Sequence, residues 1–285
     1  MGSLSNYSKL VKFEHTIFAI PFALIGFFFA LEKSDATISF KLLGLVLLCM
    51  VFARNAAMGF NRYLDRKFDK LNPRTAVREI PAGVLSPKSV LFFVIINAAL
   101  FIVATWFINS LCFYLAPVAL FVILFYSYTK RFTPLCHFVL SLGLAIAPVG
   151  AYLAVAGEFD WLPVVLGFVV FFWVSGFDII YALQDEELDK ELKLKSIPTL
   201  LGKKRALNLS KLIHFFAAVS IIIVAILTPA NWLHLIGSAV FIALLFYQHT
   251  LVKYNDLSKV NIAFFTANGI ASVIYGLFVI VGLFV

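Results

Sequence analysis

The chain has 285 residues, of which 62% are hydrophobic and only 13% are charged. A soluble domain carries about 25% charged and about 45–50% apolar residues, so this composition excludes an ordinary soluble protein and indicates repeated membrane spans. The net charge of +8, from 23 basic and 15 acidic residues, is explained by basic cytoplasmic loops, and we expect no binding to nucleic acid.

Apolar stretches long enough to cross a bilayer follow one another along the chain, and at about 30 residues per span and loop about nine of them fit. We predict spanning helices at residues 11–31, 40–60, 88–108, 111–128, 133–156, 162–183, 205–227, 232–251 and 260–284. The second and the sixth continue into acidic segments. The expectation is therefore an all-α polytopic protein that forms a single integral membrane domain, residues 1–285.

Charge is distributed unevenly between the two sides of these predicted spans. Nearly all lysines and arginines fall on the side of the N-terminus and of the loops after the even-numbered helices, whereas the other side has only Lys33 and Lys41. The positive-inside rule places the basic side in the cytoplasm. An odd number of spans then puts the C-terminus outside.

The first acidic segment follows the second predicted span. Asn61, Asp65 and Asp69 are each four residues apart, a spacing that stacks three oxygen-bearing side chains on one face of a helix. Basic residues surround them. This combination is typical of a site for a divalent metal ion and phosphate.

A second segment repeats the device after the sixth span, with Asp185 and Asp189 four residues apart and Asp178 two turns upstream on the same face. Hard cations such as Mg²⁺ take carboxylate and phosphate oxygens, so the predicted metal ligands come from both segments: Asn61, Asp65, Asp69, Asp185 and Asp189. Basic side chains would hold the remaining phosphate oxygens, and the candidates are Arg66, Lys67, Arg74, Arg78, Lys130 and Arg131. The bland alternative is that these charges only mark the membrane boundary.

Arg54 lies inside the second span, seven residues before Asn61 and on the same face. A charge within a span is costly and usually faces a cavity, so we predict that Arg54 binds the carboxylate of a second substrate or a phosphate; an internal ion pair with a nearby acid is the alternative. Tyr126, four residues before Lys130, is assigned to the same acceptor site. Lys12 and His15 are further candidates, whereas the other histidines are interpreted as packing or interfacial residues: His137, His214, His234 and His249.

These motifs resemble those of the UbiA superfamily of intramembrane prenyltransferases. The resemblance rests on N-x-x-x-D-x-x-x-D from Asn61 to Asp69, on D-x-x-x-D at Asp185–Asp189 and on Y-x-x-x-K at Tyr126–Lys130. The surrounding segments NPRTAVREIPAG, YSYTKRFT and GFDIIYALQDEELD are similar to the 4-hydroxybenzoate polyprenyltransferase branch, and within it to homologues of the futalosine route to menaquinone. The resemblance to the UbiA superfamily covers essentially the whole chain.

The resemblance implies nine transmembrane helices around a central cavity, with a cytoplasmic cap made by the loops after helices 2 and 6. It implies an Mg²⁺-dependent enzyme that transfers a polyprenyl group from polyprenyl diphosphate to an aromatic acid in respiratory quinone synthesis. The catalytic carboxylates would be those of Asp65, Asp69, Asp185 and Asp189, and Lys130 would contact the diphosphate. Tyr181 stands where some members carry an aspartate, and Asp178 and Tyr181 remain additional candidates.

Two readings of a different class stay open. A secondary transporter could use the acidic motifs for ion coupling, but transporter sites usually lie near the bilayer midplane, whereas these acids cluster at helix ends. A non-catalytic membrane scaffold would leave both motifs without a purpose. Within the enzyme reading, the expected host membrane is the bacterial inner membrane, and a menaquinone-type acceptor is favoured over 4-hydroxybenzoate.

Overall fold

A computed structural model describes residues 4–12, 18–34, 37–229 and 231–285. In these ranges the chain is helical and contains no β-strand beyond an isolated bridge between Lys253 and Asp256. The first elements are α1 (Leu4–Leu10), α2 (Ile20–Ser34), α3 (Phe40–Leu71), α4 (Pro87–Trp106), α5 (Ser110–Thr129), α6 (Cys136–Ala156) and α7 (Trp161–Ala182). They are followed by the 3₁₀ turn η2 (Leu183–Asp185), α8 (Glu186–Glu191), α9 (Ile197–Leu201), α10 (Lys203–Leu227), α11 (Trp232–Leu251), the π-helix η3 (Ile262–Ala267) and α12 (Asn268–Gly282).

Within the described residues, 8 helices are long and apolar enough to cross a membrane. α2 adds a further apolar helix but has only 15 residues. The all-α, polytopic membrane fold expected from the sequence is therefore confirmed, with the count of nine met approximately.

The first predicted helix, residues 11–31, is wrong at its start. α1 ends at Leu10 and α2 begins at Ile20, directly before Pro21; residues 13–17 lie outside the described part of the chain. Proline lacks a backbone N–H and is accommodated in the first turn of a helix, where that hydrogen bond is not needed. Pro21 therefore stands at the beginning of α2 instead of kinking a longer helix.

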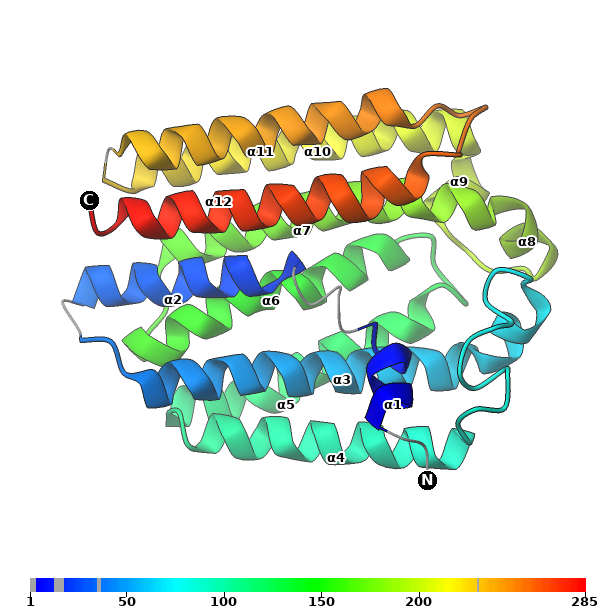
Figure 1. Cartoon of the computed structure of the whole chain (residues 1–285), viewed down its shortest axis with the longest axis horizontal. Coiled ribbons are helices and arrows are strands. Elements are labelled where there is room, and N and C mark those ends of the chain that lie inside the picture. Colours follow the sequence, from blue (N-terminus) through cyan, green and yellow to red (C-terminus); the bar gives the residue numbers. More distant parts are fainter. Residues whose placement is uncertain (1–3, 13–17, 35–36, 230) are drawn as a thin grey trace.

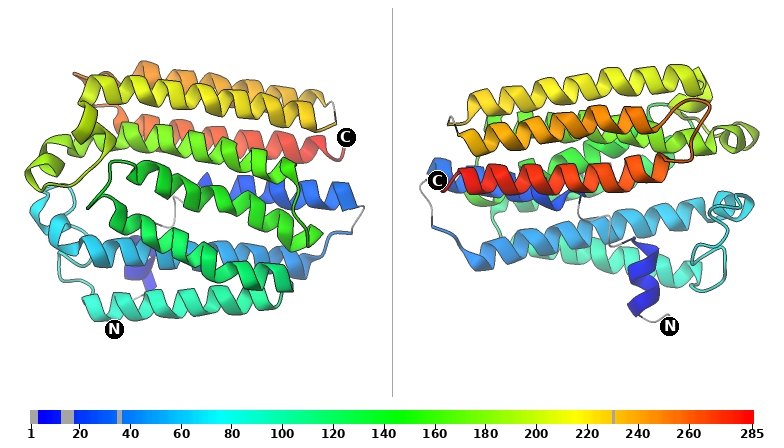
Figure 2. Two further views of the ribbon diagram at one scale, coloured as in Figure 1. Left: turned by 180° about the vertical axis from the view of Figure 1, so that it is seen from behind. Right: turned by 45° about the horizontal axis from the view of Figure 1, so that its top comes forward.

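The long helices run side by side along the longest axis of the molecule (Figure 1). The loop after α3 lies with α8 and α9 at one end, on the right in Figure 1, and the C-terminus lies at the opposite end. Figure 2 shows the same clustering from behind and from above. Two loops that are distant in sequence thus meet at the end of the bundle that carries both acidic motifs.

α3 continues as one helix from its apolar part through the first acidic motif. Ser39 caps its N-terminus by accepting a hydrogen bond from the Leu42 backbone N–H. Along the polar extension Arg62, Asp65 and Asp69 are buried. Their spacing follows the helical period, so a single face of α3 brings charged groups into the protein interior.

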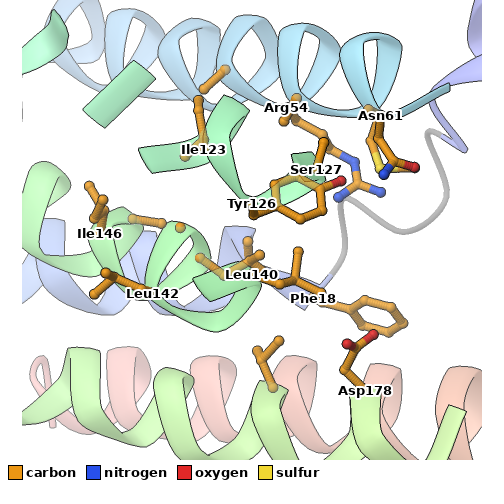
Figure 3. Close-up of a pocket in the computed structure, with 18 of the residues that line it drawn as sticks. Phe18, Arg54, Asn61, Ile123, Tyr126, Ser127, Leu140, Leu142, Ile146 and Asp178 are labelled. Atoms are coloured by element: carbon orange, nitrogen blue, oxygen red, sulfur yellow. The ribbon is translucent and has the colours of Figure 1, made fainter. Parts of the chain in front are cut away.

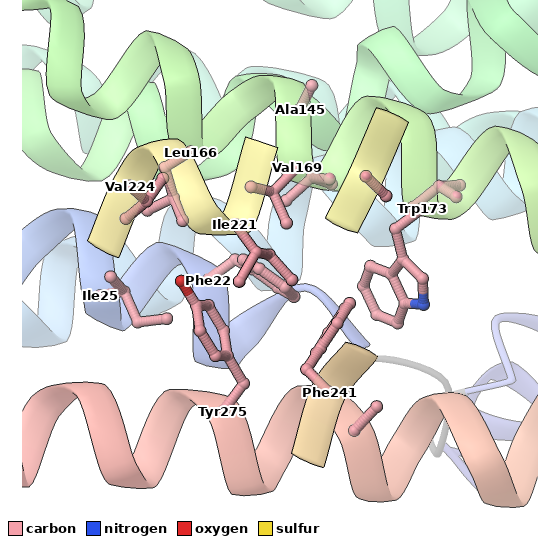
Figure 4. Close-up of a cluster of buried hydrophobic side chains, with 14 of the residues drawn as sticks. Phe22, Ile25, Ala145, Leu166, Val169, Trp173, Ile221, Val224, Phe241 and Tyr275 are labelled. Carbon is pink, nitrogen blue, oxygen red and sulfur yellow. The ribbon is translucent and has the colours of Figure 1, made fainter. Parts of the chain in front are cut away.

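A closed aromatic core occupies the other half of the bundle, where α2, α7, α10, α11 and α12 pack together (Figure 4). Trp173 of α7 is fully buried and lies 5.2 Å from the Phe22 ring and 5.4 Å from the Phe241 ring, measured between ring centroids. Tyr275 of α12 completes the group, 5.7 Å from Phe22. Large rings in tilted and edge-on contact fill this region and fix α7 against the neighbouring helices.

The last predicted span is interrupted near its start. Residues 262–267 form a π-helical turn, and α12 begins at Asn268. The Asn268 side-chain amide donates hydrogen bonds to the carbonyls of Ala263 and Phe264, both at 3.0 Å, which satisfies backbone groups that the wider turn displaces.

Candidate active site

A cavity of about 1750 Å³ lies between α3, α5, α6 and α7 and extends to the end of the bundle that carries the acidic motifs. Figure 3 shows side chains of these helices pointing into it. Its lining changes along its length, because the end near the loops carries the charged motif residues and the remainder is largely apolar. The apolar lining includes Val46, Phe101, Leu115, Ile123, Leu142, Ile146 and Phe168.

Asp65 is the most enclosed acid of the first motif, with 2% of its surface exposed. Its Oδ2 accepts the Lys130 ammonium at 2.7 Å, and its Oδ1 accepts Arg131 Nη2 at 2.9 Å. Asn61 Nδ2 donates a further hydrogen bond at 3.2 Å. Burying a carboxylate is costly without such partners, so the end of α5 is what allows Asp65 to be charged here.

Asp69 lies one helical turn beyond Asp65 and pairs with a different cation. Arg78, from the loop after α3, donates to Asp69 Oδ1 at 2.7 Å. The other oxygen, Oδ2, is buried and has no hydrogen-bond partner among the described residues. An enclosed carboxylate oxygen on a cavity wall is suited to a cation supplied from outside the protein.

Asp185 connects the two motifs. Arg74, from the loop after α3, donates through both Nε (3.2 Å to Oδ1) and Nη2 (to Oδ2), which is the bidentate arrangement that holds a carboxylate most firmly. Asn72 Nδ2 donates to Oδ1 at 3.1 Å, and Arg74 Nη1 donates to the Tyr181 hydroxyl at 3.0 Å. Asp189 also lines the cavity and is half-buried.

The donor set fits a hard cation only in combination with a ligand. No group of three or more His, Cys, Asp or Glu side chains converges on one point within the described residues. Mg²⁺ is commonly held by one or two carboxylates together with substrate phosphates, so dispersed carboxylates around a cavity match that mode. The buried, unpartnered Asp69 Oδ2 agrees with it.

The predicted acceptor residues lie deeper than the motif acids. Arg54 and Tyr126 both line the cavity and point into it from α3 and α5 (Figure 3). Arg54 Nη2 donates to the Lys12 carbonyl at 3.2 Å, and Lys12 lines the cavity as well. His15 lies outside the described residues.

Comparison with known proteins shows the family to which this chain belongs. The model of the UbiA prenyltransferase family matches residues 19–270, most of the chain. The chain belongs to the UbiA prenyltransferase family. The resemblance seen in the motifs and the prenyltransferase class expected from it are thereby confirmed.

Individual relatives agree with this family. The chain is 30% identical to the 4-hydroxybenzoate octaprenyltransferase of Vesicomyosocius okutanii subsp. Calyptogena okutanii, over 85% of this chain and 89% of the relative. The apo structure of a UbiA homologue from Aeropyrum pernix K1 superposes with a TM-score of 0.85 at 28% identity, covering 94% of this chain and 98% of that one. A UbiA homologue from Archaeoglobus fulgidus bound to GPP and Mg²⁺ has the same fold, with a TM-score of 0.78 at 21% identity, covering 98% of this chain and 100% of that one.

Some predicted diphosphate residues of this UbiA-family chain are not brought to the cavity. Arg66 folds back, with its guanidinium 4.4 Å from the centre of the Tyr63 ring, and Lys67 is exposed. Arg131 stands behind Asp65 and does not line the cavity either. Arg66 and Lys67 lie on α3 but off the face that carries Asp65 and Asp69. Arg74 and Arg78 reach the acids from the following loop.

Three residues at the site were missed or misread from the sequence. Asn72 bonds Asp185, and Arg62 is buried on the cavity wall. His137, interpreted as a packing or interfacial residue, instead lies buried on the cavity wall with its Nδ1 2.7 Å from Asp178 Oδ2. The two residues are 41 positions apart, and only the packing of α6 on α7 reveals the pair.

Proposed function

We propose that this protein transfers a polyprenyl group from a polyprenyl diphosphate to an aromatic carboxylic acid, with Mg²⁺ as cofactor, in the synthesis of a respiratory quinone. The observation that carries this proposal is the cavity itself. One end presents carboxylates and cations for a metal–diphosphate headgroup, and the rest offers an apolar volume for a prenyl chain. The similarity to a 4-hydroxybenzoate octaprenyltransferase, and the GPP and Mg²⁺ bound to the Archaeoglobus homologue, support it.

The headgroup would sit among Asn61, Asp65, Asp69, Asp185 and Asp189, with Arg74, Arg78 and Lys130 beside them. Mg²⁺ bound there would supply Lewis-acid activation and neutralise the charge of the departing diphosphate. The protein's own cations would stabilise the same charge from fixed positions, which is the main source of catalysis in sites of this kind. Apolar walls would keep water away from the allylic cation.

The acceptor would bind between the headgroup site and the apolar walls. Arg54 offers a guanidinium fork to a carboxylate, and Tyr126 lies beside it. Both a 4-hydroxybenzoate-type and a dihydroxynaphthoate-type acid carry a carboxylate on an activated ring. The amino-acid sequences of the segments around the motifs favour the dihydroxynaphthoate type of acceptor, as in the futalosine route to menaquinone.

We propose that the N-terminus and the capped end of the bundle face the cytoplasm and that the C-terminus lies outside, in the inner membrane of a bacterium; the excess of basic residues on the N-terminal side supports this orientation. We infer that residues 1–285 act as one unit there. A secondary transporter is the alternative function. It would show solute counterflow in liposomes without any covalent product.

The test is prenyl transfer by the purified protein in lipid, with a polyprenyl diphosphate and Mg²⁺. 4-Hydroxybenzoate and 1,4-dihydroxy-6-naphthoate are offered separately, and products are identified by mass spectrometry. We expect a prenylated product from one acid, lost on addition of EDTA and restored by Mg²⁺. Absence of donor binding would overturn the proposal.

A further inference from the structure

Two cations at the end of α5 bind the same carboxylate, but they stand differently toward the cavity. Lys130 Nζ lies 2.7 Å from Asp65 Oδ2, and Arg131 Nη2 lies 2.9 Å from Asp65 Oδ1. Lys130 borders the cavity, whereas Arg131 is not part of its wall. A phosphate group in the cavity could take the ammonium of Lys130 but not the guanidinium of Arg131. The role of Arg131 is therefore to be sought in its contact with Asp65.

The guanidinium of Arg131 is held by α3 and α5 together. Nη2 also donates to the Leu64 carbonyl at 3.3 Å, and Nη1 donates to the Ser127 carbonyl in the last turn of α5. The central carbon of the guanidinium lies 5.4 Å from the centre of the Phe68 ring. Arginine presents its donors in a rigid planar fork, so these contacts set the direction in which Nη2 points. Oδ1 of Asp65 is thereby tied to a group outside the cavity wall.

The other oxygen of Asp65 has partners that belong to the cavity. Oδ2 accepts from Lys130 and from Asn61 Nδ2, the latter at 3.2 Å, and both residues line the cavity. Lysine carries a compact charge on a flexible stem and can turn from one anion to another. When a metal–diphosphate headgroup enters, Lys130 can turn to the diphosphate and leave Oδ2 to the metal ion. Oδ1 is not released in this way, because Arg131 lies outside the cavity.

The number of oxygens that Asp65 can offer bears on the choice of metal ion. Ca²⁺ takes about 6–8 oxygen ligands in a flexible geometry and accepts both oxygens of one carboxylate. Mg²⁺ is smaller and demands a near-ideal octahedron, which the narrow bite of a bidentate carboxylate does not fit. A carboxylate that offers one oxygen and keeps the other bonded to arginine therefore suits Mg²⁺ and disfavours Ca²⁺.

We propose that Arg131 is a positioning residue that keeps Asp65 Oδ1 from the metal ion, so that Asp65 binds through Oδ2 alone and the site selects Mg²⁺ over Ca²⁺. This inference rests on the proposed function. Lys130 exchanges its partner when the donor binds, and Arg131 keeps its partner throughout. Loss of Arg131 should therefore change which ion supports donor binding, in addition to how tightly the donor binds.

The test is binding of a donor analogue to the full chain in lipid nanodiscs, with either Mg²⁺ or Ca²⁺ as the metal ion. Geranyl S-thiolodiphosphate, whose C–S bond resists cleavage, reports binding separately from prenyl transfer, and calorimetric titration gives its Kd with each ion. We expect wild type to bind it more tightly with Mg²⁺. Arg131→Met keeps the packing against Phe68 but loses the fork. The ratio of Kd with Ca²⁺ to Kd with Mg²⁺ should then fall about 10-fold or more, as when a partner behind a metal ligand is removed.

Three further variants separate metal selection from a general loss of charge or of folding. Lys130→Met should weaken binding by a similar factor with both ions and leave the ratio unchanged. Arg66→Met removes a charge of α3 that stacks on the Tyr63 ring and should change neither Kd. Arg131→Lys retains the charge at the end of α5 and guards against a folding defect in Arg131→Met. Its single ammonium cannot reproduce the fork, so its ratio should fall as well.

A lower ratio in the Arg131 variants, with an unchanged ratio in Lys130→Met, would support the inference. A wild-type ratio in folded Arg131→Met and Arg131→Lys would overturn it. Equal binding of the analogue by wild type with Mg²⁺ and with Ca²⁺ would overturn it as well. A wild-type protein without any metal-dependent binding of the analogue would instead contradict the proposed function together with this inference.

Discussion

The two halves of this bundle share α7, but one half is a packed aromatic core and the other contains the cavity. On one side of α7, Trp173 is locked among Phe22, Phe241 and Tyr275, and the space is filled by rings (Figure 4). On the other side and toward the cap, Asp178 and Asp185 border a cavity of about 1750 Å³. The aromatic half is held by side-chain shape, whereas the cavity half is held by charges that come from separate helices and loops.

The difference indicates which half can lose side-chain atoms without losing stability. A packed core loses stability when atoms are removed, because the surrounding rings cannot follow. The charged half already contains an open volume, and its acids are paired with cations that a diphosphate could also bind. Substitutions in the cavity half should therefore change activity much more than stability, and substitutions in the packed half should do the reverse.

The largest effect is expected from the acids. Asp65→Ala and Asp185→Ala should each lower prenyl transfer by about 1000-fold or more, because each removes metal-directed charge and releases the cations that it orders. The thermal midpoint in detergent should move little. Transfer near the wild-type rate in either variant would show that the metal assignment is wrong.

The basic residues near the first motif allow a test of whether their position, and not only their charge, matters for transfer. Arg74→Gln and Arg78→Gln should each lower transfer about 10–100-fold, since a charge-assisted hydrogen bond to phosphate contributes about 1.5–3 kcal/mol. Arg66→Gln and Lys67→Gln, on the same segment but off the cavity wall, should leave the rate unchanged. Equal losses in both sets would mean that general positive charge, and not placement, governs donor binding.

The features that the sequence predicts best are those with a local signal. Helical spacing gave the first acidic motif, and hydropathy gave the spans from α3 onward. The start of α2 was misplaced because the apolar stretch begins at residue 11, whereas the helix begins only at Ile20, with Pro21 in its first turn.

The pairings that the sequence does not predict are contacts between distant segments. Arg74 and Asp185 are 111 residues apart, and nothing in the local pattern of either predicts their pairing. The same holds for His137 and Asp178. Conversely, Arg66 and Lys67 were chosen for proximity in sequence, yet one residue along a helix turns a side chain by about 100°, enough to face away from the cavity.

A smaller and more selective effect is expected at Arg54. Arg54→Ala should raise KM for the aromatic acid about 10–100-fold, the cost of losing a charge-assisted clamp on a carboxylate, with donor hydrolysis unchanged. Neutral esters of the same acids should lose no activity in the variant. If KM for the polyprenyl diphosphate rises instead, Arg54 belongs to the donor site, and the two ends of the cavity are not divided as the geometry suggests.

The smallest effect on rate and the clearest effect on stability are expected where α2 crosses α6. A Cβ on Gly26 would lie 2.2 Å from the Pro148 carbonyl oxygen, so this crossing depends on the absence of a side chain. Gly26→Ala should destabilise the protein by about 1–3 kcal/mol, the usual range for overpacking, and lower its thermal midpoint. Gly150→Ala in the same α6 helix meets nothing within 4 Å and is the matched control. Since Gly26 does not line the cavity, Gly26→Ala should keep the wild-type kcat below its melting range. A loss of kcat in Gly26→Ala without a change in midpoint would mean that the packed half sets the geometry of the acids, and that the division between the two halves is wrong.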